Sequence, residues 1–189
     1  IIPDYVYRKN IKKKNKKIKT IGIISNLRPV KNPELQKSII TFYCKNRKNV
    51  NFNIIGRDYK NIYKGLSAKF KKKVVWKKFI KNEKIFSFNK SIDLLLITSF
   101  FESSPNIITE AFSNNLPVVS TPNIGSKNLI KNNHNGFLSN NFETSKMINA
   151  LDHVLKHQKK FSKNAKNSFM KKYKHQKNLK KIKSYFIVK

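Results

Sequence analysis

The feature that most constrains the fold of this chain is a repeated alternation between short apolar runs and longer amphipathic stretches. Apolar or β-branched residues dominate the runs at residues 21–25, 50–55, 74–76, 93–98 and 117–121, which have the length of buried strands. Helical spacing of apolar residues follows Asn32 and recurs at residues 82–89 and 105–115. Strands that alternate with helices predict an α/β fold, with a Rossmann-like parallel sheet covered by helices on both faces.

The two ends of the chain differ from this pattern. The chain opens at Ile1 and not at a methionine, which indicates an excerpt of a longer polypeptide, and its first residues are rich in lysine. We therefore expect residues 1–19 to be an interdomain linker and residues 20–189 to be one domain. From about residue 144 the apolar residues have helical spacing, which predicts C-terminal helices.

Charge and cysteine content bear on partners and compartment. Forty-two basic residues against nine acidic ones give a net charge of +33, which favours polyanions such as nucleic acid, anionic lipid or phosphorylated substrates. The same excess fits a genome rich in A and T, whose lysines form a solvated surface. No apolar run approaches the roughly 20 residues that span a bilayer. Cys44 is the single cysteine, so we expect a core thiol in a reducing cytoplasm.

A parallel sheet brings the ends of its strands to one rim, where ligands usually bind. The loops that follow Ser25, Ile55, Thr98 and Thr121 are therefore expected to meet there.

The loop at residues 99–106 follows a predicted buried strand and opens a predicted helix. The backbone N–H groups of Ser103, Ser104 and Asn106 are then available to an anion, and the helix dipole adds to the attraction. Glu102 in the loop and Glu110 on the helix suit sugar hydroxyls, because carboxylates accept strong hydrogen bonds. The alternative is that Glu102 only favours a helix N-terminus and that Glu110 lies on a solvated face.

The same region resembles a known family. Residues 101–112 read FESSPNIITEAF, and LPVVST at 116–121 and IG at 124–125 follow. This order resembles the E-x7-E region of the retaining glycosyltransferases of group 1, whose fold is called GT-B. Residues 25–32 resemble the first loop of their C-terminal domain, residues 54–56 a strand end in I-x-G, and residues 135–138 an N-G-x-L that follows the last strand.

The resemblance implies a role for each matching residue. Lys31 matches the cation that contacts the donor diphosphate, and Arg28 is expected to share that task. Glu102 is expected to contact the donor sugar, Glu110 the ribose, and Gly56 to border the donor. Because these cations and a helix N-terminus can balance the leaving diphosphate, neither a metal nor another cofactor is expected. The nucleotide-diphosphate sugar is itself the donor substrate.

The sequence departs from the family pattern at three glycines. Ser103, Asn115 and Ser126 stand where the family has glycine. Glycine lets the backbone approach a phosphate closely, so Ser103 and Ser126 are expected to narrow the site without abolishing function.

The resemblance implies a donor-binding domain of a hexosyltransferase. In the full-length protein it would transfer a hexose, with retention of configuration, from a nucleotide-diphosphate sugar to a saccharide or lipid-linked acceptor. We expect a role in polysaccharide biosynthesis, such as lipopolysaccharide or capsule, in the cytoplasm or peripherally on the anionic inner face of the membrane. Because the acceptor site of such enzymes belongs to an N-terminal domain, the isolated chain is expected to be inactive.

Two other functions remain open at the level of sequence. Charge alone suggests a module that binds polyanions, although no reader motif supports nucleic acid as a partner. A sugar-nucleotide epimerase of the same fold is the second alternative, and the lost glycines also allow an inactive relative.

Overall fold

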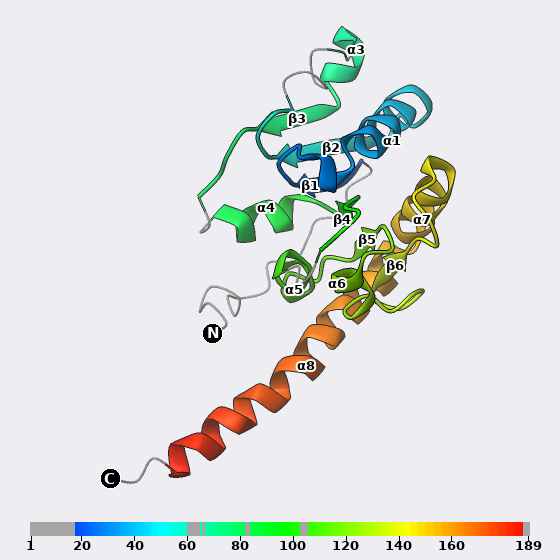
Figure 1. The fold of residues 1–189 in the computed structure, drawn as a ribbon. Coiled ribbons are helices and arrows are strands. Elements are labelled where there is room, and N and C mark those ends of the chain that lie inside the picture. Colours follow the sequence, from blue (N-terminus) through cyan, green and yellow to red (C-terminus); the bar gives the residue numbers. More distant parts are fainter. Residues whose placement is uncertain (1–17, 60–64, 66, 82–83, 103–105, 187–189) are drawn as a thin grey trace.

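The chain folds around a single six-stranded parallel sheet, seen in the computed structural model of Figure 1. The structure describes residues 18–59, 65, 67–81, 84–102 and 106–186. The strand order is β3-β2-β1-β4-β5-β6, and each neighbouring pair runs parallel. The strands are β1 (Lys19–Ile24), β2 (Val50–Ile55), β3 (Val74–Lys77), β4 (Leu94–Ile97), β5 (Val118–Ser120) and β6 (Gly136–Leu138).

Helices connect the strands and close the chain. They are the 3-10 helix η2 (Pro29–Lys31), α1 (Pro33–Asn46), α3 (Ala68–Lys71), α4 (Ile85–Ser91), α5 (Asn106–Ser113), α6 (Ile124–Lys127), α7 (Thr144–Lys156) and α8 (Gln158–Phe186). The α1 helix begins as predicted: Pro33 takes the first position, and the Asn32 side chain accepts the Leu35 N–H at 3.2 Å. Asparagine is among the residues best suited to that cap.

The predicted α/β class and parallel sheet are confirmed, and the five expected strands lie within two residues of their predicted ends. The sixth strand corrects one expectation. The N-G-x-L segment was expected to follow the last strand, but Gly136–Leu138 is itself the last strand, paired with Val118–Ser120. A three-residue strand shows no periodicity, so only its pairing reveals it. The linker boundary stays a prediction, because residues 1–17 lie outside the described residues.

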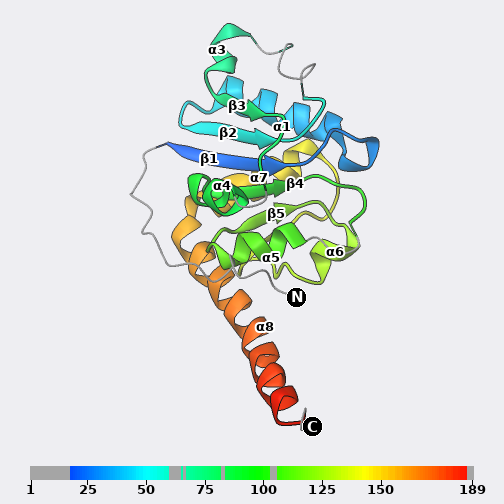
Figure 2. The same cartoon turned by 90° about the vertical axis from the view of Figure 1, so that its left-hand side faces the viewer.

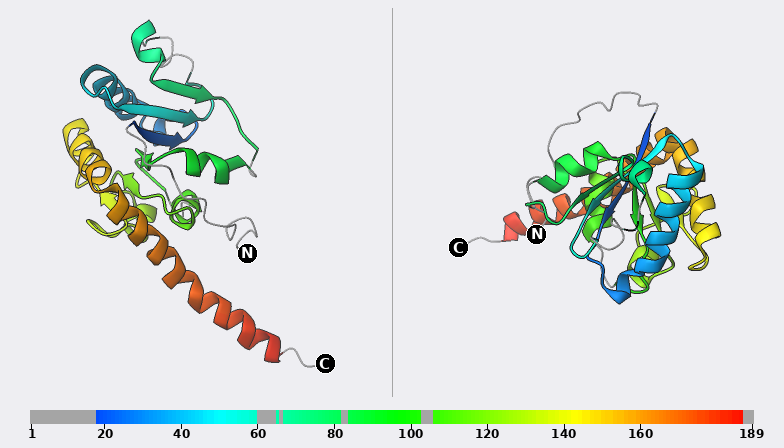
Figure 3. Two further views of the ribbon diagram at one scale, coloured as in Figure 1. Left: turned by 180° about the vertical axis from the view of Figure 1, so that it is seen from behind. Right: turned by 90° about the horizontal axis from the view of Figure 1, so that it is seen from above.

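Side chains of the central strands alternate between two hydrophobic cores. Leu94 and Leu96 pack with α1 and α7 on one face, whereas Leu95 and Ile97 pack with α5 and α8 on the other. Viewed from above, α1 and α7 lie on one side of the sheet and α4 and α5 on the opposite side (Figure 3). Successive residues of a strand point to opposite faces, so a strand buried on both faces is apolar throughout.

The connections reverse direction in the middle of the sheet. From β1 the chain moves outward through β2 to β3, and then returns to place β4 on the other side of β1. Such a reversal separates the loops that follow β1 and β4, and this is where α/β sheets bind ligands. Figure 2 shows the strands pointing towards the edge where α6 and the loop after β1 lie.

The last helix is long and only partly attached to the body. Ala165 and Phe169 are buried against the sheet side that carries α5, and the remainder of α8 extends past the sheet (Figure 1). Within the described residues, none of the helices combines the length and the hydropathy needed to cross a membrane.

One buried amide generates a stability prediction. Asn89 on α4 is fully buried, and neither its nitrogen nor its oxygen has a hydrogen-bond partner in the described structure. An unsatisfied buried polar group costs about 1–3 kcal/mol. We expect Asn89→Leu to raise the free energy of unfolding by about 1 kcal/mol, measured by urea denaturation. The exposed Asn167→Leu is the control, and a lower stability for Asn89→Leu than for the parent chain would contradict the prediction.

Candidate functional site

The loops after β1, β2, β4 and β5 lie at one edge of the sheet, because all the strands are parallel. The expectation that these loops meet at one rim is thereby confirmed. Backbone hydrogen bonds connect the neighbouring loops: Leu27 N donates to Arg57 O at 3.2 Å, and Phe100 N donates to Val30 O at 2.9 Å. The rim is therefore one connected surface.

The loop after β1 presents Lys31 at the end of η2. Lys31 precedes Asn32, whose left-handed φ of 52° turns the chain into α1. The Lys31 carbonyl oxygen accepts two side-chain hydrogen bonds, from Thr98 Oγ1 at 2.7 Å and from Gln36 Nε2 at 2.9 Å. These bonds attach the lysine backbone to both α1 and the end of β4, so the start of its side chain is fixed.

Lys31 and Glu102 form an ion pair across the rim, joining residues 71 positions apart. The two side chains retain 26% and 23% of their exposure, so both can reach a ligand. Ser99 Oγ donates to the same Glu102 oxygen, Oε1, at 2.9 Å. Ser99 is itself buried. The carboxylate is thus held by a cation on one side and by a hydroxyl from the protein interior on the other.

The backbone around Glu102 is also tied down. Glu102 O accepts the Gly125 N–H at 2.7 Å, which joins this loop to α6. Thr121 Oγ1 donates to Ser99 O at 2.6 Å. The loops after β4 and β5 therefore support one another beneath the ion pair.

Glu110 lies on the second turn of α5 and is half-buried. Burial raises the pKa of its carboxyl above the ordinary value. Within the described part of the chain, no cation or hydrogen-bond donor is recorded for this carboxylate. Asn106 is the first residue of α5 and is exposed. A carboxylate held without a partner keeps its acceptor capacity for a ligand.

The other predicted site residues vary in position. Gly56 is buried directly after β2, and a β-carbon there would lie 1.7 Å from the Ser25 carbonyl oxygen. Only glycine fits this contact. Arg28 is exposed at the cap of η2, and its side chain takes no part in the Lys31–Glu102 pair. Ser103 and Ser104 lie outside the described residues.

Two of the substituted glycine positions now have an explanation. Asn115 has a φ of 57°, a left-handed conformation that asparagine tolerates better than most residues. Ser126 corrects an expectation, because it does not narrow an exposed site. It is fully buried, and its hydroxyl lies 2.8 Å from that of Ser120, inside the protein.

The sequence analysis missed the residues that support the site. Ser99, Thr98 and Gln36 were not singled out, because each acts through a hydrogen bond to a residue distant in sequence or to a main-chain atom. The available signal was the Thr-Ser pair directly after a buried strand. Polar side chains at a strand end are well placed to hold the loop that follows.

No metal site competes with this interpretation in the described ranges. Among those residues, no group of three or more His, Cys, Asp or Glu side chains could hold a metal ion.

Known proteins resemble this chain in sequence and in fold. The model of the family "Glycosyl transferases group 1" matches residues 7–181. A search of curated proteins gave no match. Among solved structures, a mutant of TarM from S. aureus, in complex with fondaparinux, alpha-GlcNAc-glycerol and UDP, has a TM-score of 0.78 at 24% identity. The match covers 95% of this chain and 38% of that one.

Two further structures agree in fold. The C-terminal domain of LpcC, a glycosyl transferase group 1 protein from Francisella tularensis, gives a TM-score of 0.69 at 20% identity, over 82% of this chain and 86% of that one. Anabaena HepE in complex with UDP-glucose gives 0.68 at 20% identity, over 88% and 49%. The sheet matches the C-terminal domain of the GT-B fold, although the chain spans less than two fifths of TarM. Because the family model covers nearly all of its residues, the chain belongs to the glycosyl transferases of group 1.

Proposed function

We propose that this domain binds a nucleotide-diphosphate sugar at the rim that carries Lys31 and Glu102. In the whole protein it would transfer a hexose to a saccharide or lipid-linked acceptor with retention of configuration. The observation that carries the proposal is the Lys31–Glu102 pair, which places a cation and a carboxylate side by side at the ligand-binding edge of the sheet.

The pair suits the two halves of such a donor. The ammonium group of Lys31 attracts the diphosphate, while Glu102 accepts hydrogen bonds from sugar hydroxyls. A bound diphosphate competes with Glu102 for Lys31 and frees an acceptor oxygen for the sugar. Lys31 and Glu102 keep about a quarter of their exposure, so a ligand can reach both side chains.

The remaining rim residues complete the proposed donor site. We propose that Glu110, whose carboxylate has no partner among the described residues, accepts hydrogen bonds from the ribose hydroxyls. Asn106, together with Ser103 and Ser104, is proposed to offer N–H groups to the diphosphate, with Arg28 as a second cation. Gly56 keeps the chain after β2 close to the loop after β1.

Sugar transfer breaks the bond between the anomeric carbon and a diphosphate oxygen. Negative charge grows on the departing diphosphate, and a fixed cation such as Lys31 stabilises that charge where it develops. We propose that this electrostatic contribution replaces a metal or another cofactor. We expect the 189-residue chain by itself to bind donor without transferring sugar, because acceptor binding in such enzymes involves another domain.

The biological setting is also a proposal. The UDP and UDP-glucose complexes of structures with this fold make uridine nucleotides the first donors to test. Polysaccharide biosynthesis, such as lipopolysaccharide or capsule, at the cytoplasmic face of an anionic membrane suits a hexosyltransferase with this charge.

Screening UDP-, GDP- and ADP-sugars by thermal shift identifies the donor. DNA binding without any response to nucleotide sugars would instead support a polyanion-binding module.

Removing the Glu110 carboxylate tests the ribose assignment. We expect Glu110→Ala to weaken donor binding about tenfold or more, because a hydrogen bond to a charged group contributes about 1.5–3 kcal/mol. Isothermal titration with the donor from the screen measures this. Glu34→Ala removes an exposed carboxylate on α1 and is the control. An unchanged donor affinity of the Glu110→Ala variant would show that Glu110 does not bind the donor.

The raised pKa of Glu110 predicts a pH dependence. The carboxylate form, which accepts the hydroxyl hydrogen bonds, is present above the raised pKa and is lost as the pH falls through it. Donor affinity should therefore begin to fall at a higher pH than it would for a glutamate of ordinary pKa. Titrations from neutral to acidic pH should show the step in the parent chain and lack it in Glu110→Gln. A step of equal size in both would assign the pH dependence to another group.

Ser99 is proposed as a positioning residue for Glu102. We expect Ser99→Ala to weaken binding of the nucleotide-diphosphate sugar several-fold but not to weaken binding of the nucleotide diphosphate alone. Only the sugar contacts Glu102, and a less firmly held Glu102 competes no more strongly for Lys31. The ratio of the two affinities is the measurement, with the melting temperature as a check on folding. Ser99→Thr keeps the hydroxyl and should restore the ratio. Equal losses for both ligands would indicate a purely structural role.

A further inference from the structure

A second pocket lies away from the proposed donor site, between α5, the segment joining α6 to β6, and α8. Its volume of about 610 Å³ lies within the usual range of ligand sites, roughly 300–1,000 Å³. Lys31, Glu102, Glu110 and the other proposed donor residues are not among those that line it. The pocket is therefore a separate surface whose ligand the donor site does not explain.

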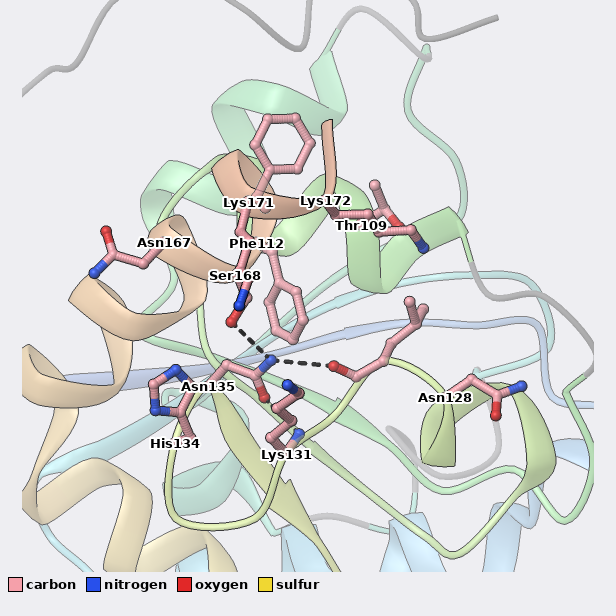
Figure 4. A pocket seen from close by; sticks show the side chains of 12 residues that line it. Thr109, Phe112, Asn128, Lys131, His134, Asn135, Asn167, Ser168, Lys171 and Lys172 are labelled. Atoms are coloured by element: carbon pink, nitrogen blue, oxygen red, sulfur yellow. Dashed lines mark hydrogen bonds between the residues drawn. The ribbon is translucent and has the colours of Figure 1, made fainter. Parts of the chain in front are cut away.

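The pocket has lysine side chains at its walls and an apolar floor. Lys131 and His134 come from the segment before β6, and Lys171 and Lys172 come from α8. None of the twelve described residues that line the pocket is acidic. Figure 4 shows the ring of Phe112 between these two groups of residues. Such a lining suits an anion that carries an apolar group.

The pocket is fixed before any ligand arrives. Asn135 is 1% exposed, and its side-chain nitrogen donates to Leu129 O and to Ser168 Oγ, each at 3.1 Å (Figure 4). Its oxygen accepts the Lys131 N–H at 2.8 Å. One buried amide thus ties the segment before β6 to itself and to α8, so little conformational entropy is lost when the pocket is filled.

Charge continues from the pocket along the C-terminal helix. The sequence of α8, residues 158–186, contains eleven lysines and no aspartate or glutamate. Met170, which neighbours Lys171 in sequence, keeps 53% of its exposure, so α8 also carries an exposed apolar side chain. A cationic helix with an exposed apolar residue and a preformed anion pocket is complementary to a surface of anionic lipid, where basic and apolar contributions add.

We propose that this pocket binds the phosphate headgroup of an anionic lipid, and that α8 lies along the membrane surface. This proposal rests on the proposed function in one respect: it names the surface through which the enzyme would contact the membrane. It does not depend on donor binding. Lys131 and Lys171 approach the headgroup from opposite walls, while the rest of α8 contributes through its field.

The experiment must distinguish binding at this pocket from nonspecific binding by the lysines that occur along the whole chain. Lys131→Gln combined with Lys171→Gln removes two charges from the pocket. The control, Lys37→Gln combined with Lys48→Gln, also removes two exposed charges. Lys37 lies on α1, which packs in the core on the opposite face of the sheet from α5, and Lys48 follows α1 in sequence. Binding is measured by co-sedimentation with vesicles of phosphatidylcholine, alone or equimolar with phosphatidylglycerol, at about 0.15 M salt.

We expect the pocket variant to lose about tenfold or more in affinity for the anionic vesicles, because each lysine at an anionic surface contributes roughly a fivefold factor. The control variant should lose less than about twofold, since diffuse charges are screened at this salt. Equal losses in the two variants, or no loss in either, would overturn the proposal. Binding of inorganic phosphate that is lost in the pocket variant, while vesicle binding stays at the parent level, would also overturn the proposal and would reassign the pocket to a soluble phosphate.

Donor titration of the same variants keeps this proposal distinct from the proposed function. Both double variants should bind the nucleotide-diphosphate sugar as the parent chain does. Vesicle binding without donor binding would count against the donor site alone, and the reverse result would count against the lipid site alone.

Discussion

The parallel pairing of β1 with both β2 and β4 is the constraint on which the site depends. It places the ends of these strands at one edge while the chain between them makes three crossings. Lys31 and Glu102 are 71 residues apart, and they meet because each follows a central strand at that edge. The two cores enforce this register, since a shift of one residue would exchange Leu95 and Leu96 between opposite faces of the sheet.

The ion pair also sets the electrostatics of the unliganded rim. A carboxylate beside Lys31 lowers the local positive potential in a chain whose net charge is +33. At the proposed donor site, affinity for a diphosphate would therefore depend on exchanging one anion for another at a fixed position. This exchange favours ligands that also engage the displaced Glu102, which a sugar hydroxyl can do and a bare anion cannot. The pair can thus convert a general attraction for anions into selectivity for a diphosphate with an attached sugar.

Sequence reasoning recovered the elements whose signals are local. The strands β1, β2 and β4 are runs of apolar residues, and α1 has Asn32 and Pro33 at its start. Their order was enough to predict the sheet. The family resemblance of residues 25–32 selected Lys31, and that of residues 101–112 selected Glu102 and Glu110. It did not yield α6 or β6, which are four and three residues long. Nor could it show that Ser99 holds Glu102 or that Ser126 is buried, because both facts depend on contacts between separate loops.

The positive charge of the chain could be read from the sequence, but the positions of the lysines that gather at one site could not. Composition alone indicated a partner with negative charge but assigned it to no part of the surface, because lysines occur along the whole chain. The structure separates two kinds of cationic site. At the rim, Lys31 is paired with a carboxylate and restrained by Thr98 and Gln36. Beside α8, Lys131 and Lys171 stand over an apolar base with no acid among the lining residues. A cation paired with a carboxylate favours an anion that can replace its partner, whereas a lysine cluster in a pocket without an acidic lining residue favours any anion that fits, so the two sites need not select the same ligand.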